Sequence, residues 1–339
     1  MKKFIFLFAL LGSLHSAILA QTETPQETAK SFVMSGDFDN AILILSRALQ
    51  TDQKNLSLMK DLAMAYYYKR DFAKAREVVD VMLDHDNADV MAYQIGGNVY
   101  KALEEVKEAD KMYKKGLKKF PKSGPLYSEY GELLWATKDY DAINQWEKGI
   151  KEDPSFAGNY YNAALYYFYT KDKVWTIIYG EIFVNMESLT ERSTAMKQLL
   201  LDAYKEKLFS HADMTAGEEK NKNEFEKAYL GVMNKLSNMA NKGITTESLT
   251  MIRTRFVLDW FTTHAKKFPF RLFEYHRQLL KEGMFDAYNQ WIFGAAKDLT
   301  AFQTWTTNHA EAYNQFNNFQ KNRVFKLTTG QYYQTSNGR

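Results

Sequence analysis

Small side chains recur at a nearly fixed spacing through the first half of this 339-residue chain, with a period of 34 and then 33 residues. Self-similarity at a fixed period is typical of a repeat array, in which each unit packs on its neighbours. One series comprises Ala29, Ala63, Gly97, Gly131 and Ala164, and a second comprises Ala41, Ala75, Ala109 and Ala142. Large residues follow the two series, namely Phe32, Tyr66, Tyr100, Leu134 and Tyr167 after the first, and Leu45, Val79, Tyr113 and Trp146 after the second.

Polar turns divide each repeat into two helical segments. The pairs Gly36-Asp37, Arg70-Asp71 and Lys138-Asp139 each precede an aromatic residue that begins a second apolar segment, and Pro121 and Pro154 close two of the units. Two helices of a hairpin approach closely only where the side chains at their crossing are small, and large neighbours then fill the flanking grooves. The pattern therefore predicts antiparallel helical hairpins.

In these positions the chain resembles the tetratricopeptide-repeat family, whose units are pairs of antiparallel helices. The resemblance implies an all-α helical-hairpin solenoid in residues 21–190, with about five units at 22–55, 56–89, 90–123, 124–156 and 157–190. In the fifth unit Trp175 and Ile182 stand where small residues are expected. Its helices should therefore be splayed or packed against something larger.

The C-terminal half contains one stretch that resembles the fourth unit. Residues 286–294 match residues 141–149 at six of nine positions, which predicts a further tetratricopeptide-like hairpin at about 267–299, although His276 replaces the crossing residue Gly131. We expect a diverged helical region at 191–266, the hairpin and one capping helix within 267–325, and a tail at 326–339.

Residues 1–20 have the layout of a signal peptide, with Lys2 and Lys3, an apolar run from Phe4 to Leu11, and Ala20 before the expected cleavage point. An uncleaved membrane anchor is the alternative, but the apolar run is shorter than the ~20 residues that a span needs. No later segment is predicted to cross a membrane. The chain has no cysteine, and export without disulfides is most natural in a bacterial envelope, so we expect a periplasmic or secreted protein.

Net charge and residue spacing argue against several functions. Removal of the signal peptide leaves 42 basic and 41 acidic residues, and a nearly neutral chain is a poor candidate for nucleic-acid binding. The remaining histidines lack metal-ligand spacing, and Ile95 occupies the place of the last acidic ligand in a calcium-loop interpretation of residues 84–95. The sequence therefore predicts no catalytic residue, no metal site and no cofactor.

The resemblance also implies a binding groove, because the first helix of each unit lines the inner face in this family. Family positions that face the groove correspond here to Lys60, Met64, Tyr67, Tyr68, Met91, Gln94, Asn98, Lys101, Ser128, Glu132, Trp135, Tyr161, Leu165, Phe168 and Tyr169. Lys60 suits the carboxylate clamp of some family members, but Met64 and Glu132 do not. Aromatic and amide side chains suit an extended peptide or a partner helix. The alternative is that the aromatic runs Tyr66-Tyr67-Tyr68 and Tyr166-Tyr167-Phe168-Tyr169 belong to the core and pack against the C-terminal half of the same chain.

The leading functional hypothesis is a non-catalytic scaffold or adaptor that binds a protein or peptide of the cell envelope or secreted fraction. A second hypothesis is an enzyme or ligand-binding protein with its site in 191–266, where Glu224 and Glu226 are scattered acids. Homo-oligomerisation through exposed aromatic residues is a third. The sequence leaves the oligomeric state open.

Overall fold

The structure is a computed structural model that describes residues 23–170, 172–209, 222–321 and 323–334. The predicted signal peptide lies outside these residues. Within them, every regular element is a helix and there is no strand, so the all-α prediction is confirmed. No helix in this part of the chain is both long and apolar enough to cross a membrane. The chain divides into two compact units, Met1–His85 and Asp86–Arg339.

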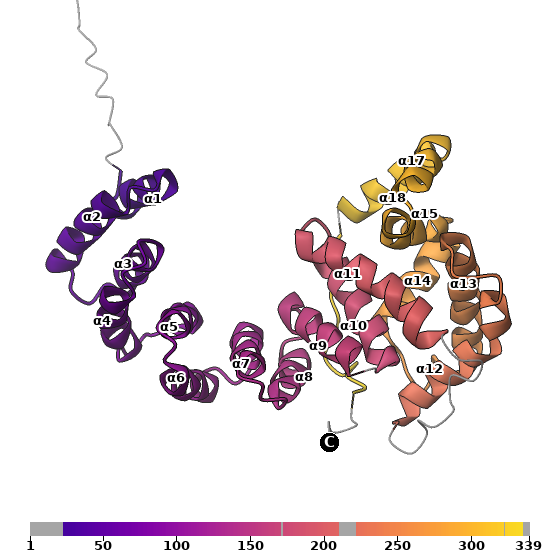
Figure 1. The fold of residues 1–339 in the computed structure, drawn as a ribbon, viewed down its shortest axis with the longest axis horizontal. Coiled ribbons are helices and arrows are strands. Elements are labelled where there is room, and N and C mark those ends of the chain that lie inside the picture. The colour runs from indigo at the N-terminus through magenta and orange to yellow at the C-terminus, as the bar shows by residue number, and fades with distance from the viewer. Residues whose placement is uncertain (1–22, 171, 210–221, 322, 335–339) are drawn as a thin grey trace, which may run out of the picture. The chain divides into compact units, whose positions relative to one another are not determined.

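The first unit consists of two antiparallel helical hairpins (Figure 1). Its helices are α1 (Pro25–Ser35), α2 (Phe38–Thr51), α3 (Leu56–Tyr68) and α4 (Phe72–Leu83). A side chain caps the start of each helix by accepting a backbone N–H bond, and the capping residues are Thr24, Asp37, Asn55 and Asp71. Ala29, Ala41 and Leu45 are buried in its core, at most 2% exposed.

The second unit begins with three more hairpins. They are formed by α5 (Val90–Ala102) with α6 (Val106–Lys119), α7 (Gly124–Ala136) with α8 (Ala142–Glu152), and α9 (Ala157–Tyr169) with α10 (Lys173–Met186). The small residues lie at the helix crossings, as predicted. A Cβ atom on Gly97 would fall 2.0 Å from the Tyr113 hydroxyl oxygen, and one on Gly131 would fall 2.3 Å from Nε1 of Trp146.

The turns between the two helices of a hairpin repeat one backbone feature. Gly36, Arg70, Glu104 and Lys138 have left-handed φ values of 79°, 65°, 58° and 60°. A left-handed residue after the last helical turn lets the next N–H groups bond back to the helix carbonyls; for example, Asp71 N donates to Tyr66 O at 2.9 Å. Three of these four positions carry a non-glycine residue in a strained conformation.

Further helices complete the second unit. They are α11 (Glu191–Asp202), the π-helix η1 (Ala203–Leu208), α12 (Glu224–Lys235), the short 3-10 helix η3 (Ser237–Ala240), α13 (Thr246–Thr263), α14 (Arg271–Lys281), α15 (Phe285–Asn289), the π-helix η4 (Gln290–Gly294), α16 (Ala295–Lys297), α17 (Leu299–Asn308) and α18 (Ala310–Lys321). The predicted hairpin at 267–299 is present as α14 followed by α15 and η4. Beyond it the structure has two helices instead of the single capping helix expected. They meet at His309, whose backbone leaves the helical region.

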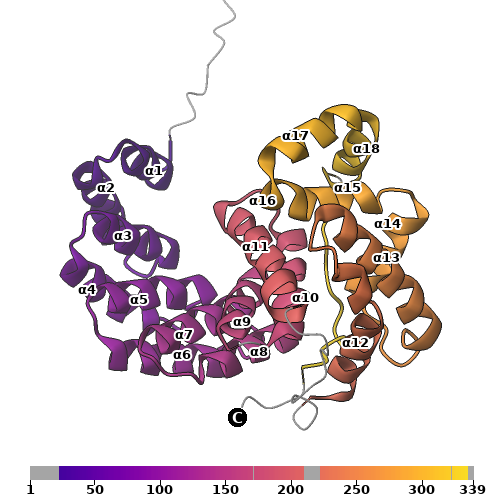
Figure 2. The ribbon, with the colours of Figure 1, turned by 45° about the vertical axis from the view of Figure 1, so that its right-hand side comes forward.

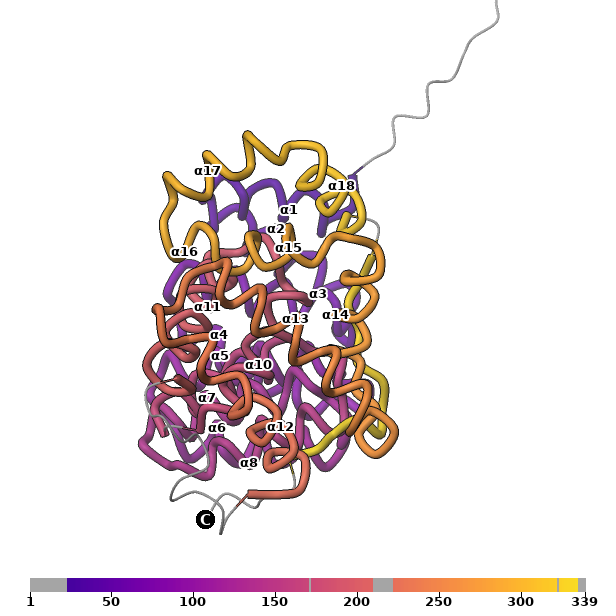
Figure 3. Tube along the Cα trace, turned by 90° about the vertical axis from the view of Figure 1, so that its right-hand side faces the viewer, coloured from indigo at the N-terminus to yellow at the C-terminus, as the bar shows by residue number. Residues whose placement is uncertain are grey.

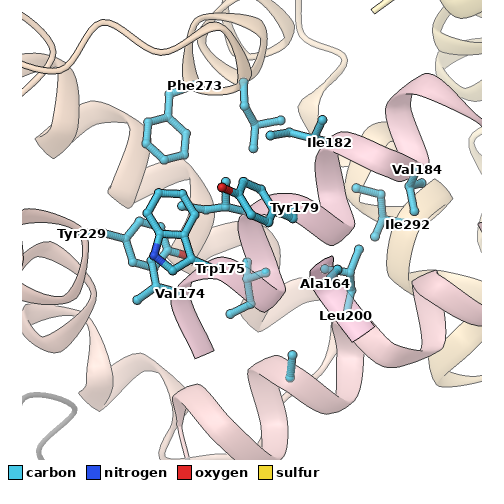
Figure 4. Packing of buried hydrophobic residues seen from close by; sticks show 14 of the residues in the cluster. Ala164, Val174, Trp175, Tyr179, Ile182, Val184, Leu200, Tyr229, Phe273 and Ile292 are labelled. Atoms are coloured by element: carbon cyan, nitrogen blue, oxygen red, sulfur yellow. The ribbon is translucent and has the colours of Figure 1, made fainter. Parts of the chain in front are cut away.

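Helix α10 is buried on all sides. Every residue from Lys173 to Val184 is inaccessible or nearly so. Figure 4 shows Trp175 and Tyr179 of α10 among side chains of later helices, including Tyr229 and Phe273. Trp175 and Ile182 therefore pack against larger elements, as their size predicted.

The C-terminal segment, residues 323–334, has no helix yet packs against the second unit. Figure 2 shows it passing between α10 and the later helices, and Figure 3 shows it beside α14. The Tyr333 ring stacks on Phe225 with centroids 4.7 Å apart, and the Tyr333 hydroxyl donates to Pro269 O at 2.7 Å. Residues 323–334, most of them in the segment expected to be a tail, are therefore held by specific contacts.

The same segment covers the buried carboxylate of Glu147 on α8. Tyr167 and Tyr179 donate their hydroxyl protons to Glu147 at 2.6 and 2.8 Å, and Tyr332 from the C-terminal segment bonds it as well. Burial raises the pKa of Glu147 to about 7, and the hydroxyl donors offset only part of that shift.

Candidate peptide-binding groove

The predicted groove residues of the first unit lie on α3. Met64 and Tyr68 line a hollow of about 430 Å³ between α1 and α3, which we call the α1–α3 hollow. Tyr67 turns instead toward the second helix of its hairpin, where its ring lies 5.5 Å from Phe72. Lys60 is half-buried and does not line the hollow. The structure thus brings together two of the four predicted residues in this unit.

The α1–α3 hollow has an apolar floor and a polar rim. Its floor is formed by Ala29, Val33, Leu45 and Ala65, and its rim by Gln26, Glu27, Lys30 and Asp61. Gln26 Nε2 donates to Ser57 Oγ at 2.9 Å and to Asp61 Oδ2 at 3.4 Å. Partial desolvation raises the pKa of Asp61, because loss of water contact disfavours its charged form. Tyr68 is 49% exposed at the edge of the hollow.

In the second unit, hydrogen bonds join the first helices of successive hairpins. Gln94 of α5 donates to Glu129 of α7 at 2.7 Å. Asn162 of α9 donates to Ser128 Oγ at 3.2 Å and to Glu132 Oε1 at 3.0 Å. Ser128 is only 3% exposed, so it is unavailable to a partner. Burial also raises the pKa of Glu129.

Residues from the second unit's own chain cover much of the predicted surface on α9. The Tyr161 ring packs on Phe183 of α10 with centroids 4.9 Å apart, and the Arg192 guanidinium lies 5.0 Å from the Tyr161 centroid. Lys207 Nζ lies 4.8 Å from the centroid of Phe168. Contacts within the chain therefore cover part of Tyr161 and Phe168, and of these two Phe168 belongs to an aromatic run for which internal packing was the alternative.

The other predicted residues of the second unit differ in exposure. Met91, Glu132, Trp135 and Tyr169 are exposed, whereas Asn98, Lys101 and Leu165 are half-buried. Trp135 lies at the end of α7, where its ring contacts Tyr140, Trp146 and Tyr166 with centroids 5.5–6.2 Å apart.

A buried polar cluster in the second unit was not predicted. Glu181 of α10 accepts hydrogen bonds from the Tyr288 hydroxyl at 2.7 Å and lies 2.8 Å from His276 Nε2. Arg253 of α13 pairs with Glu181 and bonds Asn289. The one signal in the sequence was His276, which replaces a small crossing residue.

Electrostatics in this cluster favour the ion pair. Burial opposes ionisation of Glu181, but the charge of Arg253 and the hydrogen bonds from His276 and Tyr288 outweigh it, and the pKa of Glu181 is lowered to about 2. Burial lowers the pKa of His276, which keeps the imidazole neutral near pH 7. The cavity beside these groups has a volume of about 10 Å³, enough for about one water. The cluster can join α10, α13, α14 and α15, but this cavity has no room for a substrate.

The acids considered for a site in 191–266 have structural partners. Glu226 is 1% exposed and accepts the Asn223 backbone N–H at 3.0 Å, completing a capping box at the start of α12. Glu224 is exposed and pairs with Lys267 at 2.7 Å. Among the described residues, no group of three or more histidine, aspartate or glutamate side chains is placed to hold a metal ion.

Comparison with known proteins agrees with the repeat architecture. A sequence model of the tetratricopeptide repeat family matches residues 32–95. No curated protein sequence gives a match.

Solved structures with similar folds include TTC0263, a tetratricopeptide-repeat protein from Thermus thermophilus, at 14% identity over 52% of this chain and 97% of that chain, with a TM-score of 0.43. A tetratricopeptide repeat protein from Parabacteroides merdae has 14% identity over 70% of this chain and 90% of that chain, with a TM-score of 0.42. YrrB, described as a tetratricopeptide-repeat protein with an unusual peptide-binding site, has 16% identity over 51% of this chain and 90% of that chain, with a TM-score of 0.38. Similarities with sequence identities and TM-scores this low concern the fold alone. The repeat period, the helical hairpins with their small crossing residues and the match of residues 32–95 together show that this chain contains tetratricopeptide repeats.

Proposed function

We propose that the protein is an exported, non-catalytic scaffold that binds a protein or peptide of the cell envelope or secreted fraction through the first helices of its repeats. The tetratricopeptide-repeat fold in itself suggests a protein-interaction scaffold, because stacked hairpins present an extended surface. The observation that carries the finer proposal is the α1–α3 hollow. It is a concave apolar surface in the first unit, lined by Met64 and Tyr68 from the predicted set.

The α1–α3 hollow suits a short segment that carries an apolar side chain. Its volume of about 430 Å³ falls within the range of sites that enclose a small ligand or one or two side chains. Tyr68 offers a large ring with few rotatable bonds, and Met64 adapts to different shapes. The amide and carboxylate groups of Gln26 and Asp61 at the rim can pair with backbone N–H groups of a bound segment.

Export is supported by the signal-like sequence of residues 1–20. The Glu181 cluster gives no reason to propose catalysis, because the cavity beside it is about 10 Å³ and has no room for a substrate. Fractionation tests the first point, because an exported protein should be recovered from the envelope or the medium in a form shortened at its N-terminus. Recovery of the full-length chain from the cytoplasm would contradict export.

Site-specific photo-crosslinking tests the groove. A photoreactive residue at Tyr68 should capture a discrete partner in living cells, because Tyr68 is 49% exposed at the hollow. The matched control is Val81 on α4, which is 60% exposed on the second helix of the same hairpin. Val81 should capture no discrete partner.

A pair of charge substitutions shows whether the hollow itself is responsible. Met64→Glu places a charge in the lining and should abolish the Tyr68 crosslink. Met34→Glu, on α1 but outside the lining and 80% exposed, should leave it intact. A crosslink that survives Met64→Glu, or one that forms only within the chain, would show that the hollow is not a binding surface.

A further inference from the structure

A second, chemically different pocket lies in the C-terminal part of the second unit. It has a volume of about 310 Å³. Its lining comprises Asn185, Ser188, Arg271, Tyr275, Gln320, Arg323, Val324 and Phe325. These residues come from the end of α10, the start of α14, the end of α18 and the C-terminal segment. None of them belongs to the predicted groove.

Two arginines give this pocket its charge. Arg271 is half-buried in the first turn of α14, and its guanidinium lies 5.9 and 5.8 Å from the ring centroids of Tyr275 and Phe325. Arg323 stacks on Phe319 at 3.9 Å. Among the described residues, no carboxylate lines the pocket. Across the described part of the chain, neither guanidinium forms an ion pair or a side-chain hydrogen bond.

The acids on neighbouring elements do not neutralise these arginines. Glu187, beside Ser188, is engaged by Arg192 at 2.6 Å. Glu274 lies one turn after Arg271 on α14 but is not part of the lining. Within the described ranges, the two positive charges of the pocket therefore have no counterion.

Uncharged hydrogen-bonding groups accompany the charges. Burial raises the pKa of Tyr275 to about 12, so its hydroxyl keeps its proton at neutral pH, and it is bonded to Gln320. The Asn185 side chain is fixed as well, but its amide nitrogen donates to Glu181 O at 2.8 Å and to the Tyr288 hydroxyl at 2.7 Å, so both of its N–H groups are engaged within the protein. The Tyr275 hydroxyl is therefore an uncharged donor of the pocket, and because Gln320 holds it in place it loses little freedom when a ligand binds.

We propose that this pocket binds a small organic anion through a phosphate or carboxylate group held by Arg271 and Arg323. The guanidinium fork matches the oxygens of both groups and forms paired charge-assisted hydrogen bonds with them. Two uncompensated charges favour a ligand with charge near −2, such as a phosphate monoester or a dicarboxylate. The volume is at the lower end of the range for small-molecule sites. The expected ligand is therefore a small molecule and not the surface of another protein.

Calorimetric titration of the whole mature chain with inorganic phosphate and with succinate, at constant ionic strength, tests the site. We expect saturable 1:1 binding of at least one of them in the millimolar range or tighter. A preference for phosphate assigns a phosphate monoester, and a preference for succinate assigns a dicarboxylate. Arg271→Gln and Arg323→Gln should each weaken binding at least about tenfold, because each removes charge-assisted hydrogen bonds.

The matched control is Arg277→Gln on the same helix. Arg277 also stacks on an aromatic ring, 3.8 Å from the Phe261 centroid, but does not line the pocket. This variant should bind like the wild type. If Arg271→Gln fails to fold, Arg323→Gln still decides, because Arg323 lies outside any helix. The proposal is overturned if neither anion binds the wild type, or if Arg277→Gln weakens binding as much as Arg323→Gln does.

Discussion

Replacing Gly131 by alanine should destabilise the fourth hairpin, although alanine is the better helix former. The added Cβ would lie 2.3 Å from Nε1 and 2.7 Å from Cδ1 of Trp146. Trp146 is 3% exposed, and its indole N–H donates to Ser128 O at 3.1 Å. The ring therefore has to move, and in moving it gives up that bond.

The expected size of the effect follows from three contributions. Alanine in a helix interior gains about 1 kcal/mol over glycine. Forcing a methyl group into a packed contact costs about 1–3 kcal/mol, and leaving the buried indole N–H without its acceptor costs about 1–3 kcal/mol more. The free energy of unfolding should fall by about 1–5 kcal/mol.

The measurement is the urea midpoint followed by circular dichroism. Gly231→Ala on α12 is the matched control, because no described atom beyond its chain neighbours and the nearby backbone of its own helix lies within 4 Å of the added Cβ; that variant should gain up to about 1 kcal/mol. Trp146→Leu should partly rescue Gly131→Ala, since the first unit pairs Ala29 with Leu45 at the equivalent positions. If Gly131→Ala is as stable as the wild type, the crossing argument fails.

Three further predictions concern side chains of the second unit. Glu181→Gln leaves Arg253 buried without a carboxylate and should lower the free energy of unfolding by about 3–5 kcal/mol, measured by urea unfolding; a loss under about 1 kcal/mol would contradict the buried pair. Because burial raises the pKa of Glu147 from 4.5 to about 7, the folded state binds more protons between these pH values, so stability should fall as pH rises through this window. Glu147→Gln should flatten that slope, and an unchanged slope would refute the assignment. Tyr333→Ala loses the stack on Phe225 and should cost about 1–3 kcal/mol, with earlier proteolysis of the C-terminal segment; wild-type proteolysis would show that the segment is not held there.

The sequence by itself determined the repeat architecture of this protein. Period, small crossing residues and polar turns are local signals, and each hairpin contacts mainly its neighbours, so they predicted the hairpins of residues 22–190 without knowledge of the whole fold. The turns at Arg70 and Lys138 are at their expected places, where the backbone becomes left-handed. The similarity of residues 286–294 to residues 141–149 also predicted the hairpin that α14 and α15 form.

Only the tertiary structure decided which surfaces are open and which polar groups meet. Glu181 and His276 are 95 residues apart in sequence, and the repeat pattern contains no information on that pairing. Tyr161 and Phe168 occupy predicted groove positions, yet Arg192 and Lys207 from later elements lie against them.

Contacts between segments far apart in the sequence also form the pocket of Arg271 and Arg323 and hold the C-terminal segment in place. Both depend on contacts between segments that follow different helices, and no periodic signal encodes such contacts. Short-range patterns specify how a chain builds each hairpin, whereas the burial of α10 and the sites around it arise only when distant segments pack together.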